Sequence, residues 1–80
     1  MRMDKYLKVS RLIKRRTVAN EACDAGRVSV GGKPVRASYE VKIGDEITVA
    51  LGTRVLKVRV TALNEHAGKD EAATLYTVID

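Results

Sequence analysis

The hydrophobic pattern of the chain changes its period at Gly26, and no other feature constrains the fold as strongly. Before Gly26, apolar residues recur every three or four positions, which is the spacing of an amphipathic helix. After it, polar and apolar residues alternate in short runs separated by glycine-containing turns, which is typical of β-strands. A sequence of 80 residues has room for one domain. The pattern therefore predicts a single α+β domain over residues 1–80, with helices first and antiparallel hairpins after them.

The first helix is expected to begin near Met3 and to end or bend before Lys14. Asp4 in its first turn suits the positive end of the helix dipole, and its carboxylate could also cap the helix. One face is apolar and is predicted to be buried; it holds Met3, Tyr6, Leu7, Ser10 and Ile13. The opposite face is predicted to be cationic; it holds Lys5, Lys8 and Arg11, joined by Arg15 if the helix continues.

A second helix is expected to follow at once, with Thr17 as its N-cap and Gly26 as the left-handed residue that ends it. Arg15 and Arg16 stand before its N-terminus, where unpaired backbone N–H groups also favour an anion. Its apolar face is made of mostly small residues that allow a neighbour to approach closely: Val18, Ala19, Ala22, Cys23 and Ala25.

Strands account for the rest of the predicted structure. Arg27–Val30 alternates, Gly31-Gly32 predicts a two-residue hairpin turn, and the return strand belongs at a sheet edge because Pro34 cannot donate to a ladder. Further strands are predicted over Glu46–Leu51 and Arg54–Thr61, with a loop over 64–70. The tail 71–79 begins with helix formers and ends rich in β-formers, which leaves both helix and strand open for it.

Positive charge is concentrated in the N-terminal half of the sequence. The chain has 15 basic and 10 acidic residues and a net charge of +5. Residues 1–36 hold ten basic and three acidic side chains, whereas residues 37–80 hold five and seven. This one-sided field predicts a docking surface for a polyanion, and a solvated helix face is the alternative.

The composition excludes several classes of protein. A single cysteine and a single histidine make neither an internal disulfide nor a Cys/His metal site, so we expect Cys23 in the core and His66 in an exposed loop. No cofactor motif and no catalytic pair is present, so neither a cofactor nor enzymatic activity is expected. No stretch approaches the roughly 18 apolar residues of a membrane span, and the N-terminal residues lack a secretory h-region. The sequence therefore favours a cytoplasmic protein that binds no membrane, and we expect a monomer.

Four spaced motifs, taken together, resemble the S4-type RNA-binding domain. They are Arg2-x-Asp4-x-x-Leu7, Arg16-Thr17-x-Ala19, Gly26-x-Val28-x-Val30-x-Gly32 and Val41-x-x-Gly44-Asp45-x-Ile47. The resemblance covers about residues 1–50 as a core motif and leaves 51–80 as a C-terminal hairpin and tail. It implies the S4-type αL motif, in which two short helices pack on a small bent sheet. The family usually has Asn where Gly31 stands, and both residues tolerate a positive φ.

The whole chain is also similar to the RqcP family, small ribosome quality-control factors of Firmicutes, and to the related small heat-shock protein of proteobacterial ribosomes. The similarity lies in the run Met1–Thr17 and in the ending Glu71-Ala72-Ala73 and Leu75-Tyr76. It implies binding to 23S rRNA and tRNA on large ribosomal subunits obstructed by peptidyl-tRNA. It also implies support of an RqcH-type tailing factor that adds C-terminal alanine to the stalled chain. A general rRNA-binding assembly or recycling factor and a non-specific nucleic-acid chaperone remain alternatives.

The candidate RNA-binding residues are eight of the ten basic side chains in residues 1–36. Arg2 and Arg16 match the family's characteristic basic positions. Asp4 is expected to orient Arg2 or Arg16 through an ion pair or to cap its helix; the alternative is that it accepts a hydrogen bond from an RNA 2′-hydroxyl. Lys33 and Arg36, beside the hairpin, extend the basic surface or are solvated turn residues. The full set is Arg2, Lys5, Lys8, Arg11, Lys14, Arg15, Arg16 and Lys33.

Overall fold

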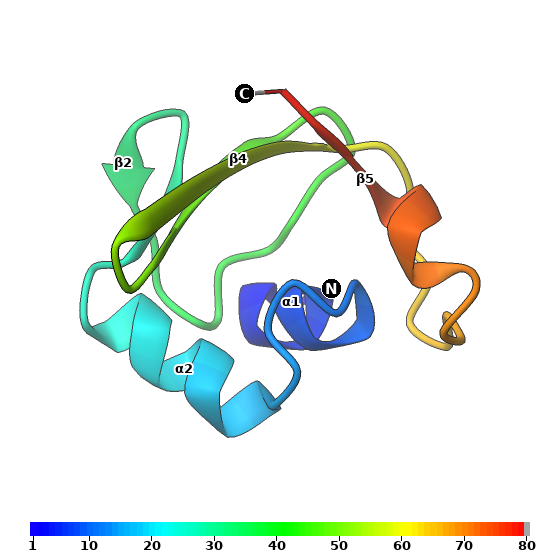
Figure 1. Ribbon diagram of the computed structural model, residues 1–80, viewed down its shortest axis with the longest axis horizontal. Helices are drawn as coiled ribbons and strands as arrows, with labels where there is room; N and C mark the ends of the chain where they lie inside the picture. The colour runs from blue at the N-terminus through cyan, green and yellow to red at the C-terminus, as the bar shows by residue number, and fades with distance from the viewer. Residues whose placement is uncertain (80) are drawn as a thin grey trace.

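The computed structural model describes residues 1–79 as two helices on one face of an antiparallel sheet (Figure 1). The sheet order is β2-β1-β3-β4-β5, so strands from both halves of the chain share one sheet. A 3₁₀-helix, η1, lies between β4 and β5. The elements are α1 (Met3–Val9), α2 (Arg16–Asp24), β1 (Val28–Val30), β2 (Lys33–Pro34), β3 (Glu46–Leu51), β4 (Arg54–Val60), η1 (Ala72–Leu75) and β5 (Tyr76–Val78).

The β1–β2 hairpin has the turn that its sequence predicts. Gly31 and Gly32 have φ values of 58° and 85°, the two positive angles that a type I′ turn requires. The turn brings Val30 opposite Lys33 and Ser29 opposite Pro34. Because β2 pairs only with β1, the proline occupies an edge strand, as expected.

The core lies between the helices and the inner face of the sheet. Successive cross-strand pairs place Val28 opposite Val49 and Ile47 opposite Val58. All four of these side chains are fully buried. The predicted inner face of the first helix is also confirmed, since Met3, Tyr6, Leu7, Ser10 and Ile13 are all buried. Cys23 is buried as predicted, and burial, followed by the nearby charges of Asp4 and Asp24, raises the pKa of its thiol to about 11.

The bounds of α1 agree with the prediction, whereas the start of α2 differs from it. The helix α1 ends at Val9, and Arg11 takes a left-handed conformation with φ of 63°, so Arg15 does not continue the cationic face. Ile13 reaches the core from this turn, in which its N–H donates to the carbonyl of Leu7. The prediction of Thr17 as N-cap is wrong, because the Ala19 N–H already donates to the Arg15 carbonyl and α2 begins at Arg16.

The apolar face of α2 is narrower than predicted. Ala19, Ala22 and Cys23 are buried, whereas Val18 and Ala25 are exposed. Gly26 follows the helix with φ of 74°, which confirms its predicted left-handed role. The small side chains therefore allow α2 to lie against α1, while its flanks remain in solvent.

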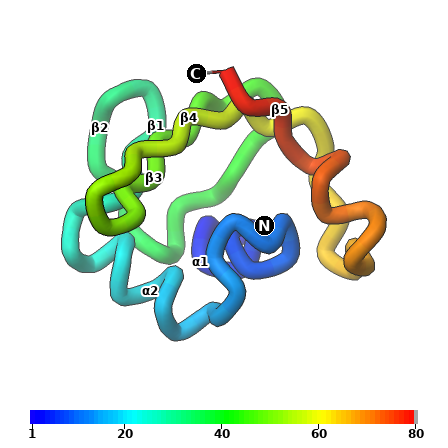
Figure 2. Tube along the Cα trace, viewed as in Figure 1, coloured from blue at the N-terminus to red at the C-terminus, as the bar shows by residue number. Residues whose placement is uncertain are grey.

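The C-terminal part completes the sheet and covers the side of α1 that faces away from α2 (Figure 2). The strand β3 has the predicted bounds, and β4 ends at Val60, one residue earlier than predicted. The ambiguous tail holds both structures, because η1 is followed directly by β5. The expected division near residue 50 falls inside β3, and the β3–β4 hairpin crosses it. Within residues 1–79, no helix is long and apolar enough to cross a membrane.

Candidate nucleic-acid interface

The first turn of α1 is fixed by backbone contacts with the segment that precedes β3. The N–H groups of Met3 and Asp4 donate to the carbonyls of Tyr39 (2.8 Å) and Ala37 (3.2 Å). Arg2 and Glu40 form an isolated antiparallel bridge, and the N-terminal amine pairs with the Glu40 carboxylate. These contacts hold the backbone of Arg2 and Asp4 in place.

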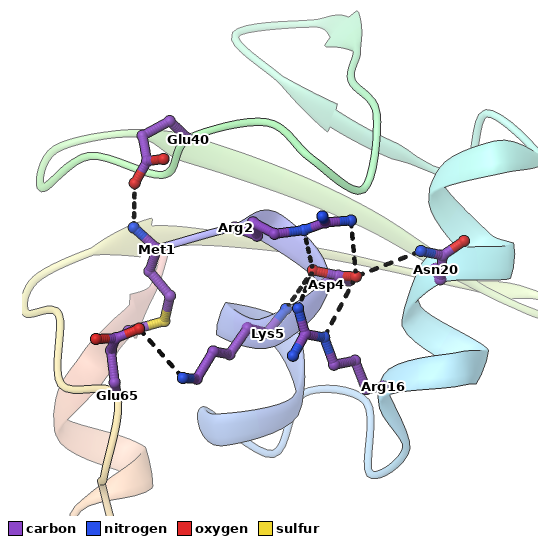
Figure 3. Close-up of polar contacts among 8 residues, drawn as sticks. All are labelled: Met1, Arg2, Asp4, Lys5, Arg16, Asn20, Glu40 and Glu65. Atoms are coloured by element: carbon purple, nitrogen blue, oxygen red, sulfur yellow. Dashed lines mark hydrogen bonds and ion pairs between the residues drawn. The ribbon is translucent and has the colours of Figure 1, made fainter.

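Asp4 is the centre of a polar cluster that joins α1 to α2 (Figure 3). Its side chain is only 4% exposed, yet Nε and Nη2 of Arg2 reach its two carboxylate oxygens at 3.2 and 3.4 Å. Nη2 and Nε of Arg16 approach the same two oxygens at 3.4 Å each. The Asn20 amide donates at 3.3 Å, and the Lys5 backbone N–H donates at 2.8 Å. A buried carboxylate is therefore satisfied from two segments of chain, the start of α1 and the first half of α2.

These contacts keep Asp4 ionised. Burial alone would raise the pKa of its carboxyl, because a charged group is costly to remove from water. Hydrogen bonds from Arg16, Asn20, the Lys5 amide and Arg2 outweigh that effect and hold the pKa below its ordinary value of 3.8. One negative charge thus stands between two positive ones, and the Asp4 cluster (Arg2, Asp4, Arg16 and Asn20) carries a net positive charge.

The two arginines of the Asp4 cluster still face solvent. Their side chains are 50% and 48% exposed. A guanidinium has five N–H donors in a planar fork, and Asp4 occupies only part of each set. The remaining donors can bind a phosphate, with the carboxylate holding each fork in one orientation. Asp4 thus forms the ion pair that was expected, with both arginines at once rather than one, and its role in orienting them for RNA stays a prediction.

Lys5 lies on α1, and its ammonium group is already paired with an acidic side chain. Its Nζ pairs with Oε1 of Glu65 at 3.1 Å, which ties the helix to the loop after β4. The hydrogen bond from Lys5 is the main reason that the pKa of Glu65 lies below its ordinary value. Lys5 therefore contributes less free charge to the predicted cationic face than Lys8 or Arg11 does.

The other predicted basic residues are exposed and lie around the connection between the two helices. Lys8 is in the last turn of α1, Arg11 and Lys14 are in the connecting turn, and Arg15 is the N-cap of α2. Lys33 is separate, since it lies in the edge strand β2 and shares no ion pair or side-chain hydrogen bond with the Asp4 cluster in the part of the chain described. The predicted site residues thus form one N-terminal region plus a separate lysine on the edge strand β2.

Two residues of this region were missed at the level of sequence. Asn20 follows Arg16 by four positions, so helical spacing could have placed both side chains on one face toward Asp4. Glu65 had no such signal, because its partner Lys5 is 60 positions away. Within residues 1–79, no group of three or more metal-ligating side chains is gathered in one place.

The fold and the basic N-terminal region define the class of protein. The S4 domain family matches residues 1–47, which include α1, α2, the β1–β2 hairpin and the start of β3. A solved structure of heat shock protein 15 from Vibrio cholerae, described as trimeric, superimposes with a TM-score of 0.90 at 29% identity. That alignment covers 98% of this chain and 80% of the other.

Closer relatives narrow the class. A protein of Bacillus subtilis called RQC P-site tRNA stabilizing factor is 52% identical over 99% of this chain and 92% of its own length. Proteins of the same name in Halalkalibacterium halodurans and Listeria monocytogenes are 50% and 47% identical, over 98% and 99% of this chain and 89% and 86% of their own lengths. The chain belongs to the S4 domain proteins and, among them, to the family of RQC P-site tRNA stabilizing factors.

Proposed function

We propose that this protein is a non-enzymatic RNA-binding factor that stabilises P-site tRNA on large ribosomal subunits during ribosome quality control. The support comes from relatives of that name at 44–52% identity over nearly the whole chain. It also comes from the charge distribution, since the N-terminal half carries the basic excess that an RNA partner requires. Residues 1–80 would act as one RNA-binding unit, because the sheet continues through both halves of the chain.

The single observation that carries a binding mechanism is the buried Asp4 carboxylate between two half-exposed guanidinium groups. Ion pairing to Asp4 removes much of the rotational freedom of both forks before RNA arrives. The entropy lost on binding is then smaller than for free surface arginines. Arg2 and Arg16 would contact phosphate or base edges, with the exposed residues Lys8, Arg11, Lys14 and Arg15 adding backbone contacts.

The partners follow from the same proposal. One RNA partner is the P-site tRNA, and the other is the 23S rRNA around it on a subunit obstructed by peptidyl-tRNA. A factor that holds this tRNA in place would support repeated alanine addition to the stalled chain by an RqcH-type tailing factor. The protein would supply binding energy and position, and the chemistry would belong to the ribosome.

The test is retention of tRNA on the large subunit. Isolated large subunits carrying a labelled peptidyl-tRNA would be challenged with excess unlabelled tRNA, with and without the protein. The protein is expected to slow the loss of label, and Arg16→Ala is expected to weaken this effect by roughly 10-fold or more in protein concentration. Arg16→Lys should give an intermediate result, because it keeps the charge but loses the planar fork.

Arg54→Ala is the matched control, since it removes an exposed arginine from the start of β4 without touching the Asp4 cluster. It is expected to behave like the parent protein. If the parent protein leaves the rate of label loss unchanged, the proposal is wrong. Binding to subunits with no effect on the tRNA would instead favour a general rRNA-binding factor.

A further inference from the structure

A second group of basic side chains lines a pocket at the C-terminal end of α1. Asp4 and its cluster lie at the N-terminal end of the same helix. The pocket has a volume of about 340 Å³, within the usual range of ligand pockets. It lies between the last turn of α1 with its connecting turn and the 65–67 segment that follows β4. Its lining residues are Lys8, Val9, Arg11, Lys14, Glu65, His66 and Ala67.

The inner wall of this pocket depends on an unusual backbone conformation. Arg11 has φ of 63° and is the one non-glycine residue with a positive φ among residues 1–79. A side chain in this conformation is sterically unfavourable, and glycine would fill the position without that cost. The conformation closes the end of α1, but the turn itself does not require an arginine at this position. Such strain is concentrated at functional sites in proteins.

The outer wall is held by polar contacts to the loop after β4. Lys5 on α1 pairs with Glu65 at 3.1 Å. The Oδ1 atom of Asn64 accepts from the His66 backbone N–H at 3.0 Å, and its Nδ2 donates to Glu71 at 3.3 Å. These contacts hold the loop in which His66 lines the pocket together with the basic residues of the turn.

The charge balance of the pocket favours an anion. Glu65 is the acidic residue in its lining, and its charge is compensated by Lys5 just outside. Lys8, Arg11 and Lys14 carry charges that no ion pair within residues 1–79 neutralises. The pocket lies at the C-terminal end of α1, where the partial negative charge of the helix dipole disfavours an anion. The helix has only seven residues, so the three cations outweigh this effect.

We propose that this pocket is a second RNA contact, which holds a backbone phosphate between Arg11, Lys14 and His66. The inference rests on the proposed function, because it deepens the same RNA interaction. Lys8 and Lys14 supply ammonium charges, Arg11 supplies a fork of donors, and the imidazole of His66 supplies a further N–H. The seven residues of α1 span about 10 Å, so the Asp4 cluster and the pocket contact different phosphates.

The experiment uses the full chain and a short oligouridylate as the probe. His66 is the single histidine of the sequence, so its ring gives one resolved set of proton resonances and reports directly on the pocket. Binding would be measured over a range of salt concentrations for the parent protein, Arg11→Gly and Lys14→Gln. Arg54→Gln, which removes an exposed charge on β4, is the control.

Addition of oligouridylate is expected to shift the His66 ring resonances in the parent protein and in Arg54→Gln. Arg11→Gly and Lys14→Gln should each lower the log–log salt slope by about 0.7, the value for one lost contact to single-stranded nucleic acid. The unfolding temperature of Arg11→Gly should rise or stay unchanged, because glycine tolerates the positive φ. Weaker binding by a protein that is no less stable would separate a ligand role from a folding role.

The inference is overturned if oligouridylate does not bind, if it binds without moving the His66 resonances, or if both pocket variants keep the parent slope. The tRNA-retention assay remains independent of this result. A pocket that passes the oligouridylate test in a protein that fails to retain tRNA would support the phosphate site and contradict the proposed function.

Discussion

The hydroxyl of Tyr6 donates a hydrogen bond of 2.7 Å to the backbone carbonyl of Leu75, 69 positions later in the chain. Both side chains are almost completely buried. This bond joins α1, which carries the Asp4 cluster, to η1, which leads into the last strand. Burial and the nearby Tyr76 raise the pKa of Tyr6 above its ordinary value, so the hydroxyl stays protonated and able to donate.

Tyr6→Phe is expected to lower the free energy of unfolding by about 0.5–1.5 kcal/mol, the usual net worth of one hydrogen bond. The larger cost of an orphaned buried group does not apply. The Leu75 carbonyl also accepts from the N–H groups of Thr61 (2.9 Å) and Ala62 (3.4 Å), so it keeps partners in the variant. Urea unfolding of both proteins measures the difference. A loss of unfolding free energy well above 3 kcal/mol would contradict this expectation. It would show that removal of the hydroxyl displaces the aromatic ring as well as removing one hydrogen bond.

Features of this fold that depend on neighbouring residues were predictable from the sequence, whereas features that depend on long-range contacts were not. The turn at Gly31 and Gly32 and the bounds of β3 were predictable, because each depends on residues close together in sequence. The bonds between Tyr6 and Leu75 and between Lys5 and Glu65 were not, because they depend on how the 61–75 segment folds back along α1. The left-handed conformation of Arg11 was not predicted for another reason: arginine, unlike glycine, gives no signal for a positive φ.

Within the candidate site, the sequence likewise indicated which residues take part, but not which distant loop packs against them. Basic clustering and the S4-type motifs indicated Arg2 and Arg16, and helical spacing could have added Asn20. That Lys5 is held by an acid and that His66 lines a basic pocket required the three-dimensional arrangement. Periodicity identifies the face on which a side chain lies, but it does not identify the loop that packs against that face.

Asp4→Asn is expected to lower the free energy of unfolding at pH 7 by about 1–3 kcal/mol, since it removes the counter-ion from two guanidinium groups at a buried site. The pH dependence should change as well. Asp4 has a folded-state pKa below 3.8, so its ionised form contributes stability above that pH, which is lost as the pH falls further. Chemical unfolding at several pH values between 7 and 2.5 should show a smaller acid loss in Asp4→Asn than in the parent.

Glu46→Gln is the control for this titration. Glu46 is an exposed acid on β3 that pairs with Arg59 at 3.0 Å, and both side chains are about half exposed. Its removal should leave the acid loss close to that of the parent protein, because exposed pairs contribute little. An equal acid loss in Asp4→Asn and in the parent would mean that the ionised Asp4 carboxylate does not stabilise the fold.

The Cys23 thiol should make the protein sensitive to alkali. Burial raises its pKa from 9.0 to about 11, so the folded state favours the neutral thiol. That contribution is complete below pH 9 and is lost as the pH rises toward 11, with a total on the order of 2 kcal/mol. Stability measured at pH 8 and pH 10.5 should fall less in Cys23→Ala than in the parent. A parallel fall in both proteins would assign the alkaline loss to other groups.

Arg16→Ala and Val58→Asp should both reduce RNA binding, the first by removing a contact to RNA and the second by destabilising the fold. Arg16 lies on the solvent side of the Asp4 cluster, and its removal should cost on the order of 1.5–3 kcal/mol of RNA binding through a lost charge-assisted contact. The fold should lose less than this, since Asp4 keeps Arg2, Asn20 and the Lys5 N–H as donors. Val58 is fully buried between Ile47 and Val78 in the sheet register, so an aspartate there should cost about 4 kcal/mol or more of stability.

Thermal unfolding and binding to large ribosomal subunits, measured for both variants, separate the two routes. Arg16→Ala should unfold near the parent temperature and bind weakly. Val58→Asp should lose binding only at temperatures where it has lost its fold, so lowering the temperature should restore both together. The opposite pattern, an unfolded Arg16→Ala and a folded Val58→Asp that cannot bind, would move the RNA-binding surface from the N-terminal helices to the sheet.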